Sequence, residues 1–546
     1  MRIITRYFNE ALRKYTKEFS ACLLLAVLVM MISILIPIGS RYYIMQVANN
    51  YGIIWMLCGI ILFCILYTIR TALNILLYRA LDRFGGSYMS HLSLDLEKRI
   101  RNSKYSDIKL MSDGVLRNIL YTDVINVFLV IGHHIPSIVC STLMISVLLI
   151  YLSIQDIWAA LIIIVATLIG ILLSIKSKKY IAKASKETNM MMKAFDTNCS
   201  EFISLTPMIQ TNDLLSYYQK KTKTAIENFI SASRNADIPI ELWSGLVSGY
   251  HSIFTILLSA FLVLPFAGRN PVDMLFFTMI ANMTLSESQK VSQLIMQVIR
   301  SNPSYNNVES IRSLKSANGN AIITDIENIK CDKVSFAYPN SEQCVLNEIS
   351  LSLNKGDTIC VKGLNGAGKT TFYKLLTGLY NPTEFQIKLN EIDLPEISRE
   401  SLNQQILYIS QDEKCLNEPL NEYLREISGK SISENTIKDW CNLINYDKGN
   451  ESITGNGDSL SGGQRKKLYL LKLLSRAESA SVIIADELAA GMDAETVPIM
   501  QSIIQKYASQ KDKIIFITDH QNYSGITCNV IMTFNNGNIT VQRQNQ

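Results

Sequence analysis

Charged residues are scarce in this chain. They make up 18% of its 546 residues, against about a quarter in ordinary soluble domains. Residues 1–310 contain 28 Lys and Arg and 19 Asp and Glu, a net charge of +9, whereas residues 311–546 contain 24 and 28, a net charge of −4. This composition excludes a disordered chain and a uniformly soluble enzyme. The basic excess lies beside apolar runs and forms no separate basic domain, so a nucleic-acid binder is not indicated.

Closely spaced cysteine pairs are missing as well. The 11 cysteines are scattered from Cys22 to Cys528 without a C-x-x-C pair. This spacing indicates neither a zinc site nor a disulfide framework. We interpret the cysteines as small buried hydrophobic residues in a reduced or membrane environment.

Long apolar runs dominate the first part of the chain. The hydrocarbon core of a bilayer is about 30 Å thick, and about 20 apolar residues of helix cross it. The first run is too long for the apolar region of a secretory signal, so we interpret it as a retained span. Six stretches have the required length: residues 19–38, 53–77, 125–153, 157–175, 241–266 and 272–298.

The distribution of Lys and Arg predicts how these spans are oriented. The leader before the first span and the segments near 78–123 and 176–240 are basic, whereas the opposite loops contain only Arg41 and Arg269. The positive-inside rule therefore places both termini in the cytosol, on a multi-pass protein of the cytoplasmic membrane. The two basic segments are too long for plain loops and keep helical spacing, so we expect them to extend the spans into the cytosol as long helices.

Polar residues inside the spans are the only indication of a substrate. Polar and ionisable groups within a membrane usually face a cavity or a partner. Helix packing is an equally good interpretation of the fifth span, because Gly245 and Gly249 form a G-x-x-x-G pattern there. The candidate cavity residues lie in the fifth and sixth spans: Ser248, His251, Thr255, Asn282 and Glu287.

A phosphate-binding motif appears after the membrane part. An apolar strand leads into G-x-x-x-x-G-K-T, which begins at Gly363 and ends at Thr370. In such a loop backbone N–H groups surround phosphate oxygens, Lys369 reaches the β- and γ-phosphates, and the Thr370 hydroxyl ligates Mg²⁺. The candidate ATP-binding residues in this motif are Gly363, Asn365, Gly366, Gly368, Lys369, Thr370 and Thr371.

A second apolar strand, residues 482–486, ends in two carboxylates. Asp486 can hold the Mg²⁺ shell, and Glu487 can polarise a water molecule for in-line attack on the γ-phosphate. Strand-like and helical runs alternate around these motifs, which predicts an α/β sheet. We therefore expect a membrane domain over 1–310, a polar linker over 311–327 and a nucleotide-binding domain over 328–546.

The remaining motifs make the chain resemble the ATP-binding-cassette (ABC) family. Residues 460–464 read Leu-Ser-Gly-Gly-Gln, the family's signature sequence. The six spans with long cytosolic helices resemble the exporter branch of that family. Single residues resemble four further family positions: Gln411 the Q-loop glutamine, His520 the switch histidine, Tyr338 the aromatic residue that stacks on adenine, and Asp493 the D-loop aspartate.

This resemblance implies a fold and an assembly. The implied fold is a membrane bundle of six transmembrane helices fused to a cytosolic α/β P-loop domain. Because family exporters need two cassettes and twelve spans, a homodimer embedded in membrane lipid is expected. ATP would then lie between Lys369 of one chain and the signature of the other, which comprises Ser461, Gly462, Gly463 and Gln464.

The resemblance also implies roles in hydrolysis. ATP and Mg²⁺ are the implied cofactors, and Glu487 and His520 are the residues expected to act on the water molecule and the γ-phosphate. Lys369 and Gln411 complete the catalytic set. The implied Mg²⁺ ligands are Thr370, Gln411 and Asp486.

The function we predict is ATP-driven export of a peptide or an amphipathic small molecule by alternating access. The runs Gly463-Gln-Arg-Lys466 and Asp486-Glu-Leu-Ala-Ala490 resemble the subgroup that exports cyclic or modified peptides. A lipid or multidrug exporter is the alternative within transport. A membrane regulator gated by the cassette is the alternative from another class, and the intact Glu487 and His520 argue against it.

Overall fold

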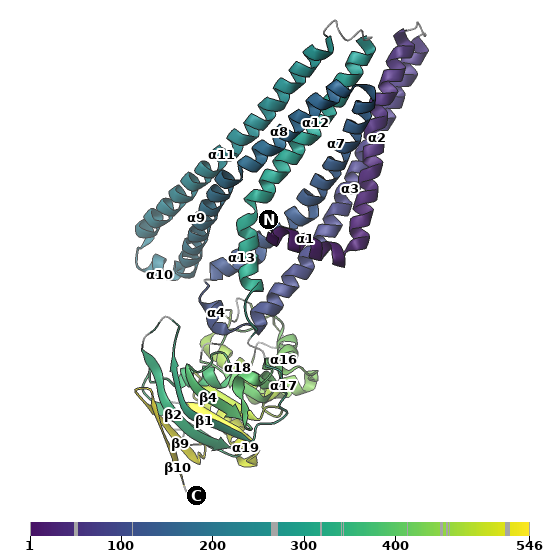
Figure 1. Ribbon diagram of the computed structural model, residues 1–546. Coiled ribbons are helices and arrows are strands. Elements are labelled where there is room, and N and C mark those ends of the chain that lie inside the picture. The colour runs from purple at the N-terminus through teal and green to yellow at the C-terminus, as the bar shows by residue number, and fades with distance from the viewer. Residues whose placement is uncertain are drawn as a thin grey trace. The chain divides into compact units, whose positions relative to one another are not determined.

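The chain folds into two compact units. The computed structural model describes residues 2–48, 53–111, 113–263, 271–316, 319–339, 341, 343–411, 413–447, 451–454, 457, 459–518 and 525–544. The first unit comprises Met1–Arg101 with Met111–Leu314, and the second comprises Asn102–Leu110 with Lys315–Gln546. Figure 1 shows the helices of the first unit and the sheets of the second.

The described part of the first unit consists of helices. Helices α2, α7, α8, α11 and α12 run alongside one another (Figure 1). Two π-helical turns, Ile119–Asp123 and Leu129–His134, interrupt the chain before α7. The helices are α1 (Arg2–Lys14), α2 (Thr16–Ala48), α3 (Ile53–Asn102), α5 (Asp113–Asn118), α6 (Val124–Phe128), α7 (Ile135–Gln155), α8 (Ile157–Lys176), α9 (Lys178–Ser204), α10 (Thr206–Thr211), α11 (Leu215–Val263), α12 (Pro271–Arg300) and α13 (Asn302–Arg312).

These helices carry apolar side chains on their outside, as lipid-facing helices do. Ile54 is 77% exposed and Trp55 is 61% exposed, which would be costly in water. Within the described residues four segments are long and apolar enough to cross a membrane: Thr16–Gln46, Ile54–Asn102, Asp113–Gln155 and Ile157–Ser204. They overlap the first four predicted spans.

The last two predicted spans fall on α11 and α12. Residues 264–270, between these helices, lie outside the described residues, so the predicted count of six spans is not confirmed. The four segments nevertheless identify a multi-pass membrane protein.

At one end of the bundle a core of aromatic residues joins α1 to α13. Tyr7 on α1 and Tyr305 on α13 are fully buried and pack edge to face with ring centroids 5.4 Å apart. Phe84 and Tyr88 of α3 are buried in the same cluster. The short N-terminal helix is therefore fixed to the bundle by a hydrophobic contact.

The second unit contains the predicted α/β sheet. A four-stranded antiparallel sheet has the order β2-β1-β4-β5, and a six-stranded mixed sheet has the order β10-β9-β3-β8-β7-β6. The strands are β1 (Asn328–Ala337), β2 (Cys344–Asn354), β3 (Thr358–Gly363), β4 (Glu384–Leu389), β5 (Ile392–Asp393), β6 (Ile406–Ile409), β7 (Val482–Asp486), β8 (Ile514–Thr518), β9 (Val530–Asn535) and β10 (Asn538–Arg543). The helices are α4 (Tyr105–Lys109), α14 (Lys369–Leu376), α15 (Arg399–Gln405), α16 (Leu420–Ser428), α17 (Glu434–Leu443), α18 (Gly462–Arg476) and α19 (Thr496–Gln510).

The central strands of the mixed sheet bring the predicted motifs together. Strands β3, β8, β7 and β6 are parallel, and every residue of β7 and β8 is buried. Continuous apolar runs are typical of strands covered on both faces. Because parallel strands end at the same edge, the loops after β3, β6 and β7 share one side of the sheet.

Residues 102–110 belong to the second unit although the chain enters and leaves them from the first. The ring of Tyr105 on α4 packs edge to face against Tyr380, with centroids 5.5 Å apart. Ser103 also forms an isolated bridge with Ser316. We expected this segment to lie within the membrane domain, and the structure groups it with the sheets.

Candidate nucleotide site

The predicted phosphate loop lies between β3 and α14, and its glycines have structural reasons to be there. Gly368 precedes the first residue of α14 with φ of 104°, in the left-handed region. A Cβ atom at this position would lie 2.7 Å from Cδ2 of Leu346. Both the backbone conformation and the space therefore require glycine. The free N–H groups of the α14 N-terminus follow directly, which is the usual place for a phosphate group.

Lys369 is held inside this loop. Its side chain is buried, and Nζ donates hydrogen bonds to the carbonyl oxygens of Gly363 at 2.7 Å and Leu364 at 3.3 Å. Asn365 and Gly366 are exposed at the tip of the loop. The loop thus surrounds a buried ammonium group, and an anion at the α14 N-terminus would meet both the helix dipole and this charge.

Asp486 connects the second motif to the first. Its Oδ2 accepts hydrogen bonds from Thr370 Oγ1 at 3.1 Å and from Tyr408 Oη at 3.3 Å. Burial is the main reason that the pKa of Asp486 is raised above its usual range, and the neighbouring Glu487 adds to the effect. Thr370 and Asp486 thus present two oxygen donors side by side, the donor type that Mg²⁺ prefers.

Glu487 follows β7 in a backbone conformation that is costly for a residue with a side chain. Its φ is 51°, and its N–H donates to the carbonyl of Thr518 at 3.2 Å. Left-handed backbone at a non-glycine residue costs about 1–3 kcal/mol and is concentrated at functional sites. The side chain is half-buried beside Asp486.

Sequence reasoning missed Lys466, which touches two predicted motifs at once. Its Nζ donates to the carbonyl oxygen of Gln411 at 3.2 Å and to that of Glu487 at 3.4 Å. Gln411 itself is exposed, two residues after β6. The sequence could have indicated this residue, because Lys466 lies one helical turn after Gly462 on α18 and therefore on the same side of the helix as the signature.

Tyr338 reaches the phosphate loop from β1. Its hydroxyl shares a hydrogen bond of 2.9 Å with Thr371 Oγ1 on α14. Its ring packs edge to face against Phe336 and Tyr380, at centroid distances of 5.0 and 5.4 Å. The predicted adenine-stacking residue is therefore half-buried and fixed beside the phosphate loop.

The signature residues form the N-terminus of α18. Ser461 Oγ accepts from Gln464 N at 3.2 Å, and Gln464 Oε1 accepts from Ser461 N at 3.1 Å, a complete capping box. Ser461 and Gly462 are exposed and Gly463 is half-buried. Among the described residues no hydrogen bond or ion pair joins residues 461–464 to the phosphate loop of the same chain.

Asp493 lies beyond Glu487 at the start of α19. Its Oδ1 accepts from Thr496 N at 2.7 Å, and its Oδ2 lies 3.4 Å from Lys467 Nζ. The hydrogen bonds from Thr496 are the main cause of the lowered pKa of this carboxyl group. His520 falls in residues 519–524, outside the described residues.

The candidate cavity residues have mixed environments. On α12, Asn282 is exposed, and Glu287 is 20% exposed with Lys290 Nζ at 3.8 Å. On α11, Ser248 and Thr255 are half-buried, and the side chain of His251 lies outside the described residues. The polar stretch of α12 also has a buried face that sequence reasoning did not separate: Thr284, Ser288 and Ser292.

The glycine pair on α11 makes no close packing contact with any other described residue. No described atom lies within 4 Å of where a Cβ atom would stand on Gly245 or Gly249. Close helix approach at these glycines, the alternative interpretation of the polar stripe, is therefore not observed among the described residues. Among the described residues, open space therefore surrounds Gly245 and Gly249 beside Ser248.

Residues 346–490 match the family model described as ABC transporter. This part of the chain is an ABC transporter domain. Such domains bind ATP, and the matched residues run from β2 to just beyond Glu487, so they include the phosphate loop, the signature and the strand that ends in Asp486.

Curated relatives of this chain include an export protein, a flippase and a transport protein. A β-(1→2)glucan export ATP-binding/permease protein of Rhizobium etli is 23% identical over 60% of the chain. An ATP-dependent lipid A-core flippase of Haemophilus ducreyi is 30% identical over 35%, and a subtilin transport ATP-binding protein of Bacillus subtilis is 28% identical over 53%. The chain spans 58%, 34% and 48% of the lengths of these relatives.

Similarity of fold extends over nearly the whole chain. The structure of a bacterial Atm1-family ABC exporter with ATP bound superposes with a TM-score of 0.83 at 14% sequence identity. The comparison covers 97% of this chain and 95% of that one. The chain therefore has the fold of an ABC exporter, with an apolar helical part followed by the nucleotide-binding part.

Proposed function

We propose that this chain is one half of a dimeric ABC exporter that hydrolyses ATP to drive transport across a membrane. The observation that carries the proposal is the contact of Thr370 with Asp486, which joins the phosphate loop to the carboxylate pair at the edge of a parallel sheet. The four apolar segments in the same chain support a membrane task. A relative named for export, matched over part of its length, and the fold of an ABC exporter support export as the direction of transport.

The proposed mechanism assigns a role to each residue of this edge. Lys369 exchanges its carbonyl partners for the β- and γ-phosphate oxygens, and the N–H groups after Gly368 hold the same phosphates. Glu487 accepts a proton from the attacking water, which its position beside Asp486 allows. We assign His520 to the γ-phosphate and Tyr338 to the adenine ring.

The residues present fit a magnesium ion. Thr370 and Asp486 offer adjacent oxygens, and we add Gln411 as a third ligand. When bound, Mg²⁺ neutralises charge on the phosphates. The chain's own contribution is to hold the Thr370 hydroxyl toward Asp486 and to keep water away from the buried carboxylate.

A second copy of the chain completes the proposed site. At the positive N-terminal end of α18, Ser461 and Gly462 are exposed, and the signature makes no described contact with the phosphate loop of its own chain. We propose that Ser461, Gly462, Gly463 and Gln464 bind the γ-phosphate held by the partner, with Asp493 beside that interface. Binding of ATP would then favour the closed dimer, and hydrolysis would release it.

The domain boundaries and the topology are part of the proposal. We assign residues 1–310 to the membrane domain, apart from residues 102–110, which group with the second unit, and we assign 311–327 to a linker and 328–546 to the nucleotide-binding domain. Helix α13 ends at Arg312 and β1 begins at Asn328, which agrees with a linker between them. The basic segments support six spans in the cytoplasmic membrane with both termini in the cytosol.

ATP hydrolysis by the full chain in lipid tests the enzymatic part. Glu487→Gln should abolish turnover while ATP stays bound, because the amide cannot accept the proton from water. Glu478→Gln is the matched control, since Glu478 is exposed after α18 and carries the same chemical change. Equal turnover in Glu487→Gln and the unmodified chain would remove Glu487 from catalysis. Negligible turnover in both would contradict the proposal that the chain hydrolyses ATP.

We propose a peptide or an amphipathic small molecule as cargo. The subtilin transport relative and the open polar face of α11 support a peptide. The lipid A-core flippase relative supports the alternative, a lipid or multidrug exporter. ATP-dependent uptake of a labelled peptide into inverted vesicles distinguishes them: uptake of lipid analogues but of no peptide would favour the alternative.

A further inference from the structure

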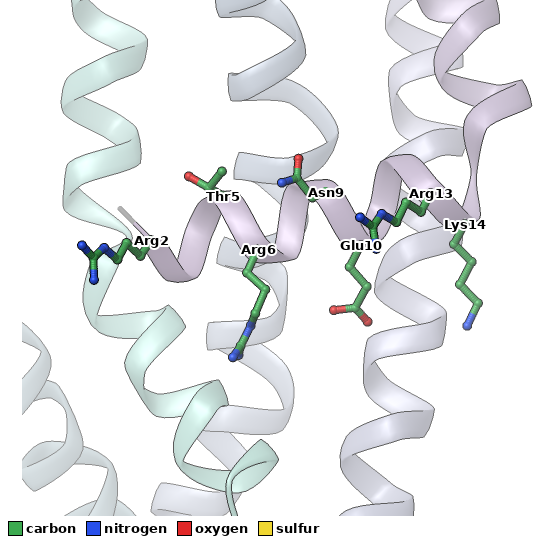
Figure 2. A pocket seen from close by; sticks show the side chains of 7 residues that line it. All are labelled: Arg2, Thr5, Arg6, Asn9, Glu10, Arg13 and Lys14. Carbon is green, nitrogen blue, oxygen red and sulfur yellow. The ribbon is translucent and has the colours of Figure 1, made fainter.

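Helix α1 presents a basic groove that the transport cycle does not use. The groove has a volume of about 960 Å³ and is open to one side. Its lining side chains come from α1 alone and are Arg2, Thr5, Arg6, Asn9, Glu10, Arg13 and Lys14. Figure 2 shows them along the helix, with Arg6, Glu10 and Lys14 pointing to one side and Thr5 and Asn9 to the other.

The opposite face of α1 is fixed to the protein. Ile4, Tyr7 and Ala11 are buried at helical spacing in the core shared with α13. Exposed Arg2, Thr5, Asn9 and Arg13 lie on the side of the helix away from this core, and exposed Lys14 points to the same side as Arg6 and Glu10 (Figure 2). The groove is therefore presented by a helix that is already ordered, which lowers the entropic cost of binding a ligand there.

Two of the charged groove residues are already neutralised by α13. Arg6 forms an ion pair with Glu309, which also accepts from the Tyr7 hydroxyl at 2.9 Å. Arg312 donates to both carboxylate oxygens of Glu10, at 3.0 and 3.1 Å. Each of these two ion pairs is neutral, and both attach α1 to α13.

Three cations of α1 have no counter-charge among the described residues. Among the described residues no carboxylate lies within ion-pair distance of Arg2, Arg13 or Lys14, and all three are exposed. Arg13 and Lys14 stand together at the end of α1, and Arg2 lies about 16 Å away along the helix axis. The groove thus offers two separate positions for an anion, with a net charge of +3.

The position of α1 in the chain indicates which anion is available. The apolar segment Thr16–Gln46 begins two residues after Lys14. The headgroup layer adds about 5–7 Å to each side of the hydrocarbon core. Lys14 and Arg13 therefore lie at the depth of the lipid phosphates. A basic groove on a helix at this depth is typical of a site for anionic lipid headgroups.

We propose that the groove of α1 binds anionic phospholipid headgroups through Arg2, Arg13 and Lys14. This inference rests on the proposed membrane placement of α2 and does not depend on the cargo or on hydrolysis. Each cation at an anionic surface raises binding by about fivefold, so loss of all three should weaken binding on the order of 100-fold. Arg6 and Glu10 are left unchanged in the test because they hold α1 in place.

The test measures lipid bound to the full chain. The protein is exchanged into detergent with an equimolar mixture of phosphatidylglycerol and phosphatidylcholine and washed, and the retained lipids are quantified by mass spectrometry. The unmodified chain should retain more phosphatidylglycerol than phosphatidylcholine. Arg2→Gln/Arg13→Gln/Lys14→Gln should retain the two lipids equally. ATP hydrolysis by the same sample reports separately on the nucleotide site.

A matched variant removes three charges elsewhere. Lys186, Lys220 and Lys223 are exposed on α9 and α11, more than ten residues beyond the predicted span ends. That distance is about 15 Å of helix, longer than the Debye length of about 8–10 Å. Their replacement by Gln should leave phosphatidylglycerol enrichment unchanged. Equal loss in both triple variants would show non-specific attraction and overturn the site.

Two further measurements use the unmodified chain, so the outcome does not depend on whether a variant folds. Washing at about 1 M NaCl, where the Debye length is about 3 Å, should remove the enrichment. Washing with inorganic phosphate at low ionic strength should leave it. Absence of enrichment in the first place, retention by the α1 variant, or displacement by phosphate alone would each overturn the proposal.

Discussion

The ammonium group of Lys369 lies 2.7 Å from the carbonyl oxygen of Gly363, the glycine that opens the phosphate loop. The residue that is expected to hold phosphate is thus held by the loop itself. Nucleotide binding must replace two carbonyl hydrogen bonds with bonds to phosphate oxygens. Since both sets of bonds satisfy the same buried charge, the exchange can occur without leaving Lys369 unpaired.

Replacement of Lys369 by Met should weaken ATP binding by about 10- to 100-fold. Hydrogen bonds to charged groups contribute about 1.5–3 kcal/mol, and the variant loses them with the phosphates. Titration with a fluorescent ATP analogue measures the change. Lys374→Met, five residues later on α14, is the control and should bind as the unmodified chain does. Unchanged affinity in Lys369→Met would contradict the assignment.

Replacement of Asp486 by Asn should stabilise the nucleotide-free protein. The raised pKa means that folding favours the protonated carboxyl group. The contribution of Asp486 to the stability of the folded protein is therefore most favourable at low pH. It is lost as pH rises from the ordinary pKa of an aspartate to the raised pKa of Asp486 in the folded protein. Above that pH range the buried charged carboxylate destabilises the folded protein, and Asn carries no such charge. At pH 8 the apparent melting temperature should rise by about 2–4 °C.

The pH dependence provides the check on Asp486. The gain from Asp486→Asn should shrink as pH is lowered toward the acid limit of folding, because the native carboxyl group is then protonated. Asp439→Asn, an exposed residue of α17, should show neither effect. A lower melting temperature for Asp486→Asn at pH 8 would show that the carboxylate is stabilised in the folded state.

Replacement of Lys466 by Met should lower the turnover number about tenfold while leaving the affinity for ATP unchanged. Lys466 donates to the backbone carbonyls of Gln411 and Glu487. Its loss should misplace Glu487 rather than the nucleotide, which makes it a positioning residue. Lys466→Arg retains the donor and should restore most of the activity. A rise in KM at constant kcat would instead indicate a role in binding.

Replacement of Ser461 by Ala should affect both stability and hydrolysis. The helix α18 loses its capping bond, which costs about 0.5–2 kcal/mol. Ser433 caps α17 with a similar bond to Thr436 N at 3.2 Å, so Ser433→Ala is matched in stability. If the signature serine contacts nucleotide, only Ser461→Ala should lose ATPase activity beyond the effect of stability. Equal ATPase activities of Ser461→Ala and Ser433→Ala would show that Ser461 only caps α18.

The strands and their functional ends could be predicted because they depend on short local patterns. An apolar run followed by a glycine-rich loop marks β3, and an apolar run followed by two acids marks β7. Parallel pairing then placed Thr370 near Asp486, and the structure has them 3.1 Å apart. The relationship could be predicted because Thr370 follows β3 and Asp486 ends β7, two parallel strands that flank β8 and end at the same edge of the sheet.

Contacts between distant side chains could not be predicted. Lys466 is 55 residues from Gln411 and 21 from Glu487, and no pattern links them. The left-handed backbone of Glu487 is set by the bond of its N–H to Thr518, which depends on the pairing of β7 with β8. The sequence also did not distinguish the buried face of α12 from its exposed face. Burial of Thr284 and exposure of Asn282 depend on which helices pack against α12.

The excursion of residues 102–110 has a mechanical consequence. The polypeptide passes between the two units at three places: after Arg101, before Met111 and after Leu314. Cleavage of the chain near residue 315 would therefore leave the second unit attached through residues 102–110, where Tyr105 of α4 packs against Tyr380. Three connections restrict rotation of one unit about the other more than a single connection would, so a displacement of the second unit would act on α3 and α13 together.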